Sequence, residues 1–246
     1  MIEIVPAILP KNYEDLKNKI ALVRGIVLVV QIDICDGVFV PNLTWPFTAG
    51  KRSGLGNSKR PDLEEAGLDS HFNNILNEEE GMPFWEDIDF ELDLMVSDAV
   101  DNFDVYTKLG PKKIIFHIEA VGNLESFKDF LEGIDVYIRD SIEFGVAINP
   151  KTPLEKIFPL ISHIDFVQCM GNDNIGYHGV ELDEKVYKRI EILRNNYVDL
   201  PIAVDIGVDL NTAPFLIKAG ATKLVAGSAI FNTDDIIGTI EEFKNL

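Results

Sequence analysis

The chain has 246 residues, of which 46% are hydrophobic and 26% charged, and 41 acidic against 22 basic residues leave a formal net charge of −19. This composition excludes a disordered chain, and its excess of acidic residues argues against nucleic-acid or anionic membrane partners. Two cysteines, Cys35 and Cys169, make no disulfide framework, so we expect reduced, buried thiols. We find no signal peptide and no segment with the ~20 apolar residues of a membrane span, and we expect a cytoplasmic protein.

Short hydrophobic segments alternate with longer amphipathic ones along the chain. The predicted strands are Ile2–Ile8, Ile26–Cys35, Phe90–Val96, Lys113–Glu119, Phe144–Asn149, Ile164–Met170, Ile202–Val208 and Lys223–Ala229. The predicted helices are Tyr13–Val23, Ser97–Leu109, Leu124–Asp140, Leu154–Leu160, Glu184–Asn195, Ala213–Lys218 and Asp234–Phe243. Eight strands with intervening helices predict a (β/α)8 TIM barrel formed by a single domain, residues 1–246. A doubly wound sheet is the alternative, but the turn after the first strand lacks its glycine-rich fingerprint.

One connection breaks this alternation. Residues 43–88 join the second and third predicted strands and are longer than a loop and one helix require. They include the polar stretch GKRSGLGNSKRP and the acidic run Asn77–Gly81. Because active sites of such barrels lie at the C-terminal ends of the strands, we interpret this insertion as a lid or a subunit contact. A tolerated surface insertion is the alternative.

Ionisable residues occur inside several predicted strands, where they alternate with hydrophobic ones. Strand side chains point to alternate faces, so one face receives Ile32, Ile34, Leu92, Leu94, Phe116, Ile118, Val204 and Ile206 and meets the helices. The barrel interior then receives Gln31, Asp33, Cys35, Glu91, Asp93, Met95, His117, Glu119 and Asp205. A buried carboxylate without a partner is costly, so such a group indicates a functional site.

The segment QIDICDGVFVPN resembles the second-strand signature of ribulose-phosphate 3-epimerases. Further motifs follow in the family's order: PAIL at 6–9, DLMV at 93–96, FHIEA at 116–120, AINPKTPLE at 147–155, DFVQCM at 165–170, VDIGV at 204–208 and AGSAIF at 226–231. The resemblance covers nearly the whole chain except residues 43–88. It implies a barrel enzyme that epimerises a ketopentose phosphate at the carbon beside its ketone.

The resemblance also implies roles for two carboxylates. Asp33 and Asp205 match the catalytic residues of the family, of which one removes a proton from one face of the carbon and the other returns a proton to the opposite face. A divalent metal stabilises the enediolate between the two steps. Elementary chemistry agrees, since a 1,1-proton transfer needs two carboxyl groups whose pKa values are pulled apart.

The metal site departs from the family pattern. The family uses two histidines and the two catalytic aspartates, and the histidine positions here are Gln31 and Asp93. The candidate metal ligands are therefore Gln31, Asp33, Asp93 and Asp205. Oxygen donors favour Mg or Mn over Zn or Fe, and loss of the metal is the alternative. His71 and His178 are interpreted as surface residues rather than replacement ligands.

The phosphate site implied by the resemblance is partly kept. Gly227 and Ser228 match the family's eighth-strand loop, and Gly207 matches the second glycine of the seventh-strand pair. The first glycine of that pair is replaced by Ile206. The sixth-strand loop, NDNIGYHG, also differs from the family sequence.

Other pocket positions follow the same mixed pattern. Met95 and Met170 match pocket-lining, substrate-binding residues, whereas Ala7 replaces a serine of the family. These departures leave two alternatives to a ribulose-phosphate epimerase: a related epimerase of another sugar or sugar phosphate, and a catalytically inactive binding barrel. The epimerase is preferred because Asp33 and Asp205 are both present. The resemblance further implies a homo-oligomer with a small-molecule sugar phosphate as its substrate.

Overall fold

The computed structural model describes residues 2–48 and 67–246. Eight parallel strands close into one barrel in sequence order, which confirms the predicted TIM barrel. The strands are β1 (Glu3–Ile8), β2 (Val29–Cys35), β3 (Asp89–Met95), β4 (Lys113–His117), β5 (Glu143–Ile148), β6 (Phe166–Met170), β7 (Ile202–Asp205) and β8 (Lys223–Ala226). Both faces of these strands are buried, as expected when helices cover a parallel barrel.

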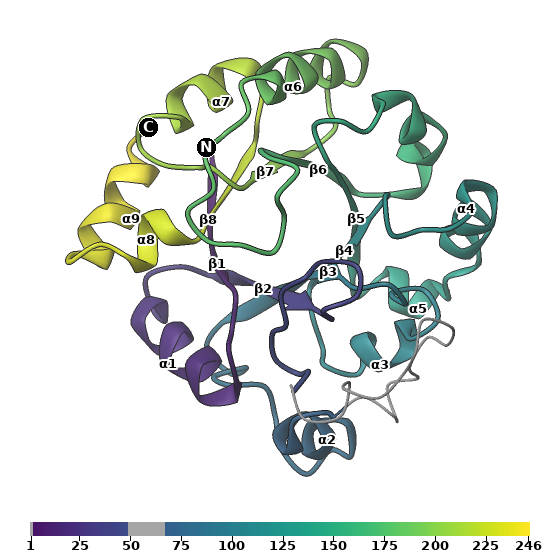
Figure 1. The fold of residues 1–246 in the computed structure, drawn as a ribbon, viewed down its shortest axis with the longest axis vertical. Helices are drawn as coiled ribbons and strands as arrows, with labels where there is room; N and C mark the ends of the chain where they lie inside the picture. Colours follow the sequence, from purple (N-terminus) through teal and green to yellow (C-terminus); the bar gives the residue numbers. More distant parts are fainter. Residues whose placement is uncertain (1, 49–66) are drawn as a thin grey trace.

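Helices surround the ring of strands (Figure 1). They are α1 (Tyr13–Val23), α2 (Ser70–Leu76), α3 (Phe103–Thr107), α4 (Leu124–Gly133), α5 (Val136–Arg139), α6 (Lys185–Asn196), α7 (Ala213–Ala219), α8 (Ser228–Phe231) and α9 (Ile236–Lys244), with 3-10 helices η1 (Leu154–Lys156) and η2 (Phe158–His163). Side chains fix several starting points: Asn12 caps α1 and Asn123 caps α4. No helix in the part of the chain that the structure describes is long and apolar enough to span a membrane. The cytoplasmic location stays a prediction.

Two strands near the end of the chain are shorter than predicted. The strand predicted to reach Ala229 ends at Ala226, because the following residues coil into α8. The strand before it ends at Asp205, where Ile206 and Gly207 take left-handed φ values of 74° and 72°. This turn stops the extended backbone directly after Asp205.

Three predicted helices are shorter than expected or divided. The region predicted as one helix over Leu124–Asp140 holds α4 and α5, and the Asp135 side chain starts α5 by accepting a hydrogen bond from the Tyr137 N–H. The helix predicted over Ser97–Leu109 retains only α3. The helix predicted over Leu154–Leu160 is replaced by η1 and η2, where a proline in the first turn of η2 lacks an N–H donor.

The described part of the insertion contains α2, which the sequence pattern did not predict. Asp69 caps α2 by accepting a hydrogen bond from the His71 N–H at 2.9 Å. The His71 ring stacks on Tyr13 of α1 with ring centroids 4.0 Å apart, and its Nδ1 lies 2.8 Å from a carboxylate oxygen of Glu80. These contacts attach α2 to α1. The stretch GKRSGLGNSKRP lies outside the described residues, and a role as lid or subunit contact stays a prediction.

Two hydrophobic layers follow the alternation of the strands. The layer between strands and helices contains the predicted residues Ile32, Ile34, Leu92, Leu94, Phe116, Ile118 and Val204. Inside the barrel, a second layer includes Cys35, Met95, Ile115, Ala147, Phe166, Met170 and Ala203. Ile206 is a correction, because it packs against the inner layer rather than the outer one. The left-handed turn after Asp205 redirects its side chain.

Candidate active site

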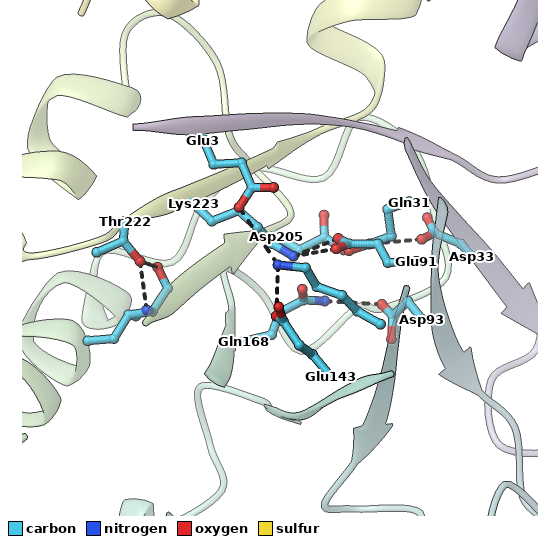
Figure 2. Close-up of polar contacts among 12 residues, drawn as sticks. Glu3, Gln31, Asp33, Glu91, Asp93, Glu143, Gln168, Asp205, Thr222 and Lys223 are labelled. Atoms are coloured by element: carbon cyan, nitrogen blue, oxygen red, sulfur yellow. Dashed lines mark hydrogen bonds and ion pairs between the residues drawn. The ribbon is translucent and has the colours of Figure 1, made fainter. Parts of the chain in front are cut away.

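Three carboxylates from three strands meet inside the barrel near its C-terminal end (Figure 2). Asp33 lies on β2, Asp93 on β3 and Asp205 at the end of β7, and all three are buried. One carboxylate oxygen of each lies within 4.8 Å of the other two. The register of β2 and β3 sets Asp33 beside Asp93, and closure of the barrel brings Asp205 to them. The structure thus brings together the three aspartates that the strand pattern singled out.

Gln31 links two of these carboxylates. Its amide nitrogen donates to Asp33 Oδ1 at 2.8 Å and to Asp205 Oδ2 at 3.0 Å. The other oxygen of Asp205, Oδ1, accepts a hydrogen bond from the Ile206 N–H at 2.7 Å. A single nitrogen atom of Gln31 therefore binds both carboxylates, although one comes from β2 and the other from β7.

Asp93 is positioned by two further buried side chains. His117 Nε2 lies 2.8 Å from Asp93 Oδ1, and the Gln168 amide donates to Asp93 Oδ2 at 3.3 Å. His117 was assigned to the interior from the sequence, but its contact with Asp93 was not foreseen. Gln168 was missed, although alternation in the sixth strand places it on the same face as Phe166 and Met170.

Burial and mutual repulsion perturb the acids of this cluster. Burial, followed by repulsion from Asp205 and Asp93, holds the pKa of Asp33 well above its usual range. Burial, followed by repulsion from Asp93, raises the pKa of Asp205 to about 7. Burial works against the charged form of His117, but the charge and hydrogen bond of Asp93, together with the charges of Glu119 and Asp205, raise its pKa. The two carboxyl groups that Gln31 bridges therefore retain a proton near neutral pH.

The donor set of the cluster fits a hard divalent cation. It offers three clustered carboxylates together with the Gln31 carbonyl oxygen, which is buried and has no hydrogen-bond partner among the described residues. Carboxylate and carbonyl oxygens are ligands that Mg and Mn prefer. Hydrogen bonds from His117 and Gln168 orient the Asp93 carboxylate, as hydrogen-bonded groups commonly do for metal-binding carboxylates.

A cavity adjoins the carboxylates at the same end of the barrel. Asp33 and Asp205 line it, and so do all five residues that the sequence analysis assigned to substrate binding, namely Met95, Met170, Gly207, Gly227 and Ser228. Ala7 and Ile206, which replace a serine and a glycine of the family, line it as well, whereas Gln31 and Asp93 do not. The structure therefore gathers these residues around one space, and their roles stay predictions.

The segment between β6 and α6 crosses the mouth of the barrel and supplies another part of the lining (Figure 1). His178 in this segment is solvent-exposed, as expected, and it also lines the cavity, which was not foreseen. Asp173, in the same segment, accepts a hydrogen bond from the Lys151 N–H at 3.1 Å and pairs with its Nζ at 3.3 Å. Its negative charge is thereby partnered outside the cavity lining.

A separate ion pair fills another part of the barrel interior. Lys223 Nζ lies 2.7 Å from both carboxylate oxygens of Glu91, and both residues are buried (Figure 2). Glu91 was assigned to the interior from the sequence, whereas its partner on β8 was missed. The two thiols are buried and free, as predicted for Cys35 and Cys169. Burial raises the pKa of both thiols, so neither is an activated nucleophile.

A closed parallel barrel with perturbed acids at the C-terminal ends of its strands is the arrangement of a (β/α)8 enzyme. Residues 69–231 match the model of the Ribulose-phosphate 3 epimerase family. The chain therefore belongs to this family, and it is a carbohydrate epimerase of the isomerase class. This confirms the resemblance recognised in the sequence.

Curated relatives match over nearly the full chain. The ribulose-phosphate 3-epimerase of Bacillus subtilis (strain 168) is 28% identical over 250 residues, which cover 99% of each chain. The ribulose-phosphate 3-epimerase of Methanocaldococcus jannaschii is 28% identical over 251 residues, which cover 99% of this chain and 90% of the relative. The family and these relatives support ribulose-phosphate 3-epimerase activity.

Solved structures share the fold at lower sequence identity. KGPDC from Streptococcus mutans superposes with a TM-score of 0.63 at 14% identity, covering 100% of this chain and 97% of that one. The 3-hexulose-6-phosphate synthase from Salmonella typhimurium gives a TM-score of 0.63 at 13% identity, covering 99% and 97%. At this identity the likeness shows the barrel fold alone.

Proposed function

We propose that this chain interconverts ribulose 5-phosphate and xylulose 5-phosphate by proton transfer between Asp33, Asp205 and carbon 3 of the sugar. The observation that carries the proposal is the bridging of Asp33 and Asp205 by one amide nitrogen of Gln31, beside the cavity that both acids line. Two carboxyl groups from distant strands are thus held at one place. A 1,1-proton transfer requires this arrangement.

The protonation of the pair suits the reaction. The carboxylate that is ionised removes the proton from carbon 3 and leaves an enediolate. The carboxyl group that holds the shared proton returns a proton to the opposite face, which inverts the carbon. The raised pKa values of Asp33 and Asp205 keep one proton available near neutral pH, so acid and base are both present. In the reverse reaction the two groups exchange roles.

Gln31, Asp33, Asp93 and Asp205 would hold a divalent cation, and Mg or Mn are the metals proposed from the oxygen donors. When bound, the cation supplies stabilisation of negative charge on the substrate oxygens. The protein's own groups act beside it: Gln31 aligns the two carboxylates, whereas His117 and Gln168 fix the direction of Asp93. The homo-oligomer implied by the resemblance stays part of the proposal.

The test is proton NMR of ribulose 5-phosphate in D2O with the protein, in the presence of Mn or Mg and in a chelated control. We expect deuterium uptake at carbon 3 and appearance of xylulose 5-phosphate. Asp33→Asn and Asp205→Asn should each abolish uptake, because an amide can neither remove nor return this proton. Asp129→Asn on the exposed surface of α4 is the matched control and should retain full activity.

Each other outcome contradicts a stated part of the proposal. Full activity in both active-site variants would sink the two-carboxylate mechanism. Deuterium uptake that survives chelation would show that the mechanism does not need a metal. If neither the metal-containing sample nor the chelated sample shows uptake, the proposed activity is refuted. Turnover of another sugar phosphate would then identify a changed substrate, and stoichiometric binding without turnover an inactive barrel.

A further inference from the structure

His178 is placed against the turn between β8 and α8. It lies in the segment between β6 and α6 and lines the same cavity as Asp33 and Asp205. A Cβ atom built on Gly227 would lie 3.9 Å from His178 Nδ1, so the imidazole ring sits beside this glycine. Ser228, the residue after Gly227, lines the cavity too.

His178 is distinctive in the electrostatics of the cavity. Among the described residues that line it, Asp33 and Asp205 are the acids, and His178 is the one side chain that can carry positive charge. The chain as a whole has a net charge of −19. A phosphorylated sugar that enters this cavity meets repulsion from the protein's overall charge, and a cation in the lining would offset part of that repulsion.

Two lysines lie close enough to act on His178, although they do not line the cavity. Lys11 and Lys19 act on His178 electrostatically, with Asp15 as the opposing charge. Lys19 Nζ is fixed by Asp15 Oδ2 at 3.0 Å and by the Leu9 carbonyl oxygen at 3.4 Å. Loss of solvent around the ring, followed by the charge of Lys19, lowers the pKa of His178, so a bound anion is needed to favour its protonated form near neutral pH.

Neighbouring chain segments closely approach two glycines of the cavity, Gly207 and Gly227. A Cβ atom on Gly207 would lie 2.5 Å from the Leu182 backbone nitrogen, and one on Gly227 would lie 3.2 Å from the Ala7 carbonyl oxygen. Both glycines line the cavity that His178 also lines, and a larger residue at either position would press against neighbouring protein atoms. An anion that enters beside Gly227 would lie next to the imidazole of His178.

We propose that His178 binds the phosphate group of the substrate and sets the preference of this enzyme for phosphorylated over unphosphorylated sugars. The inference rests on the proposed function for the identity of the sugar, but not for the anion contact itself. His178 acts on binding and takes no part in the proton transfer at carbon 3.

The test compares His178→Gln with the wild-type protein in two assays. Calorimetric titration with inorganic phosphate measures the anion contact alone, and steady-state kinetics with ribulose 5-phosphate separates KM from kcat. We expect roughly tenfold weaker phosphate binding at pH 5, a similar rise in KM and a kcat within about twofold of wild type, since one charge-assisted contact is lost. The wild-type affinity should also fall as pH rises and His178 loses its proton.

Two variants control this experiment. His178→Lys keeps a cation that does not titrate near neutral pH, so it should restore most of the affinity and remove the fall between pH 5 and pH 8 that the histidine causes. His163→Gln removes a histidine that pairs with Glu132 at 3.3 Å and does not line the cavity, and should change neither assay. Thermal melting of each variant verifies the fold.

The outcomes separate this inference from the proposed function. Equal phosphate affinity and KM in His178→Gln and wild type would overturn the inference even if the protein is an active epimerase. Absence of phosphate binding by the wild type would overturn it as well. If the wild type binds phosphate through His178 but does not epimerise ribulose 5-phosphate, the anion contact stands and the proposed function fails.

Discussion

Gln31 and Asp205 are 174 residues apart in the chain, yet the Gln31 amide nitrogen lies 3.0 Å from Asp205 Oδ2 inside the barrel. The same nitrogen donates to Asp33 at 2.8 Å. An amide at this position does two things that an imidazole cannot do together: it donates to both carboxylates through one nitrogen and keeps a carbonyl oxygen for a cation. Gln31 is therefore the residue through which the departure from the family's ligand set is best tested.

Replacement of Gln31 by His should change which metal binds. Gln31→His introduces an imidazole nitrogen into an oxygen-donor set, and imidazole favours Zn and Fe over Mg and Mn. We expect Zn affinity to rise by roughly tenfold or more relative to Mn affinity, measured by metal titration and by elemental analysis of the purified protein. Asp129→His, on the exposed surface of α4, is the control for an imidazole added elsewhere. Unchanged relative affinities would mean that Gln31 is not a metal ligand.

The carboxylate cluster should make the folded protein less stable as pH rises. The pKa of Asp205 is about 7 in the folded chain and 3.8 ordinarily, so the folded state holds a proton that the unfolded state releases between these values. Stability from this group is present below pH 3.8 and is lost as pH rises towards about 7. In chelator, the unfolding free energy of Asp205→Asn relative to wild type should therefore increase by about 3 kcal/mol from pH 5 to pH 8.

Urea unfolding at both pH values measures this difference. Asp129→Asn is the matched control, because its carboxyl group lies on the exposed face of α4 and should give a difference that stays nearly constant with pH. A constant difference for Asp205→Asn as well would contradict the raised pKa of Asp205. Groups with lowered pKa values, such as Asp15, act in the opposite direction, but they are common to both proteins and cancel.

The sequence could predict which residues enter the barrel because strand side chains alternate with a period of two. That rule placed Asp33, Asp93 and Asp205 in the interior, and the alternation of eight strands with helices predicted the barrel. The alternation rule could not predict contacts across the barrel, because these depend on strand register and on closure of the barrel. The Gln31 contact with Asp205, the His117 contact with Asp93 and the Glu91 pair with Lys223 all belong to this class.

Turns and insertions were predictable to a lesser degree. Alternation assigned Ile206 to the outer face, which is wrong because its left-handed backbone ends the strand. Helix α2 escaped prediction, since seven residues give too short a hydrophobic pattern and it is held largely by its cap and by the contacts of His71 with Tyr13 and Glu80. Local pattern fails at these places because backbone conformation or tertiary contact decides the structure.

The buried pair of Glu91 and Lys223 should show strong energetic coupling. Removing either partner leaves an uncompensated charge in the barrel, so Glu91→Leu and Lys223→Met should each destabilise the protein by about 3–5 kcal/mol. The double variant should lose much less than the sum, since both charges are then absent. The exposed pair of Lys128 and Glu132, 3.1 Å apart on α4, is the control and should couple by less than about 1 kcal/mol. Urea unfolding of the four proteins in each cycle gives the coupling, and additive losses at Glu91 and Lys223 would refute it.

At position 206 a glycine variant should be more stable than an alanine variant, which is the reverse of the usual order. Its φ of 74° is one that β-branched residues rarely adopt, and glycine is the residue that tolerates it without strain. We therefore expect Ile206→Gly to be more stable than Ile206→Ala by about 1 kcal/mol, because both lose the same packing except for one methyl group and only alanine keeps the strain. Ile237, exposed within α9, is the control, where alanine should exceed glycine by about 1 kcal/mol. If the alanine variant is the more stable one at both positions in urea unfolding, the left-handed turn that follows Asp205 stores no strain.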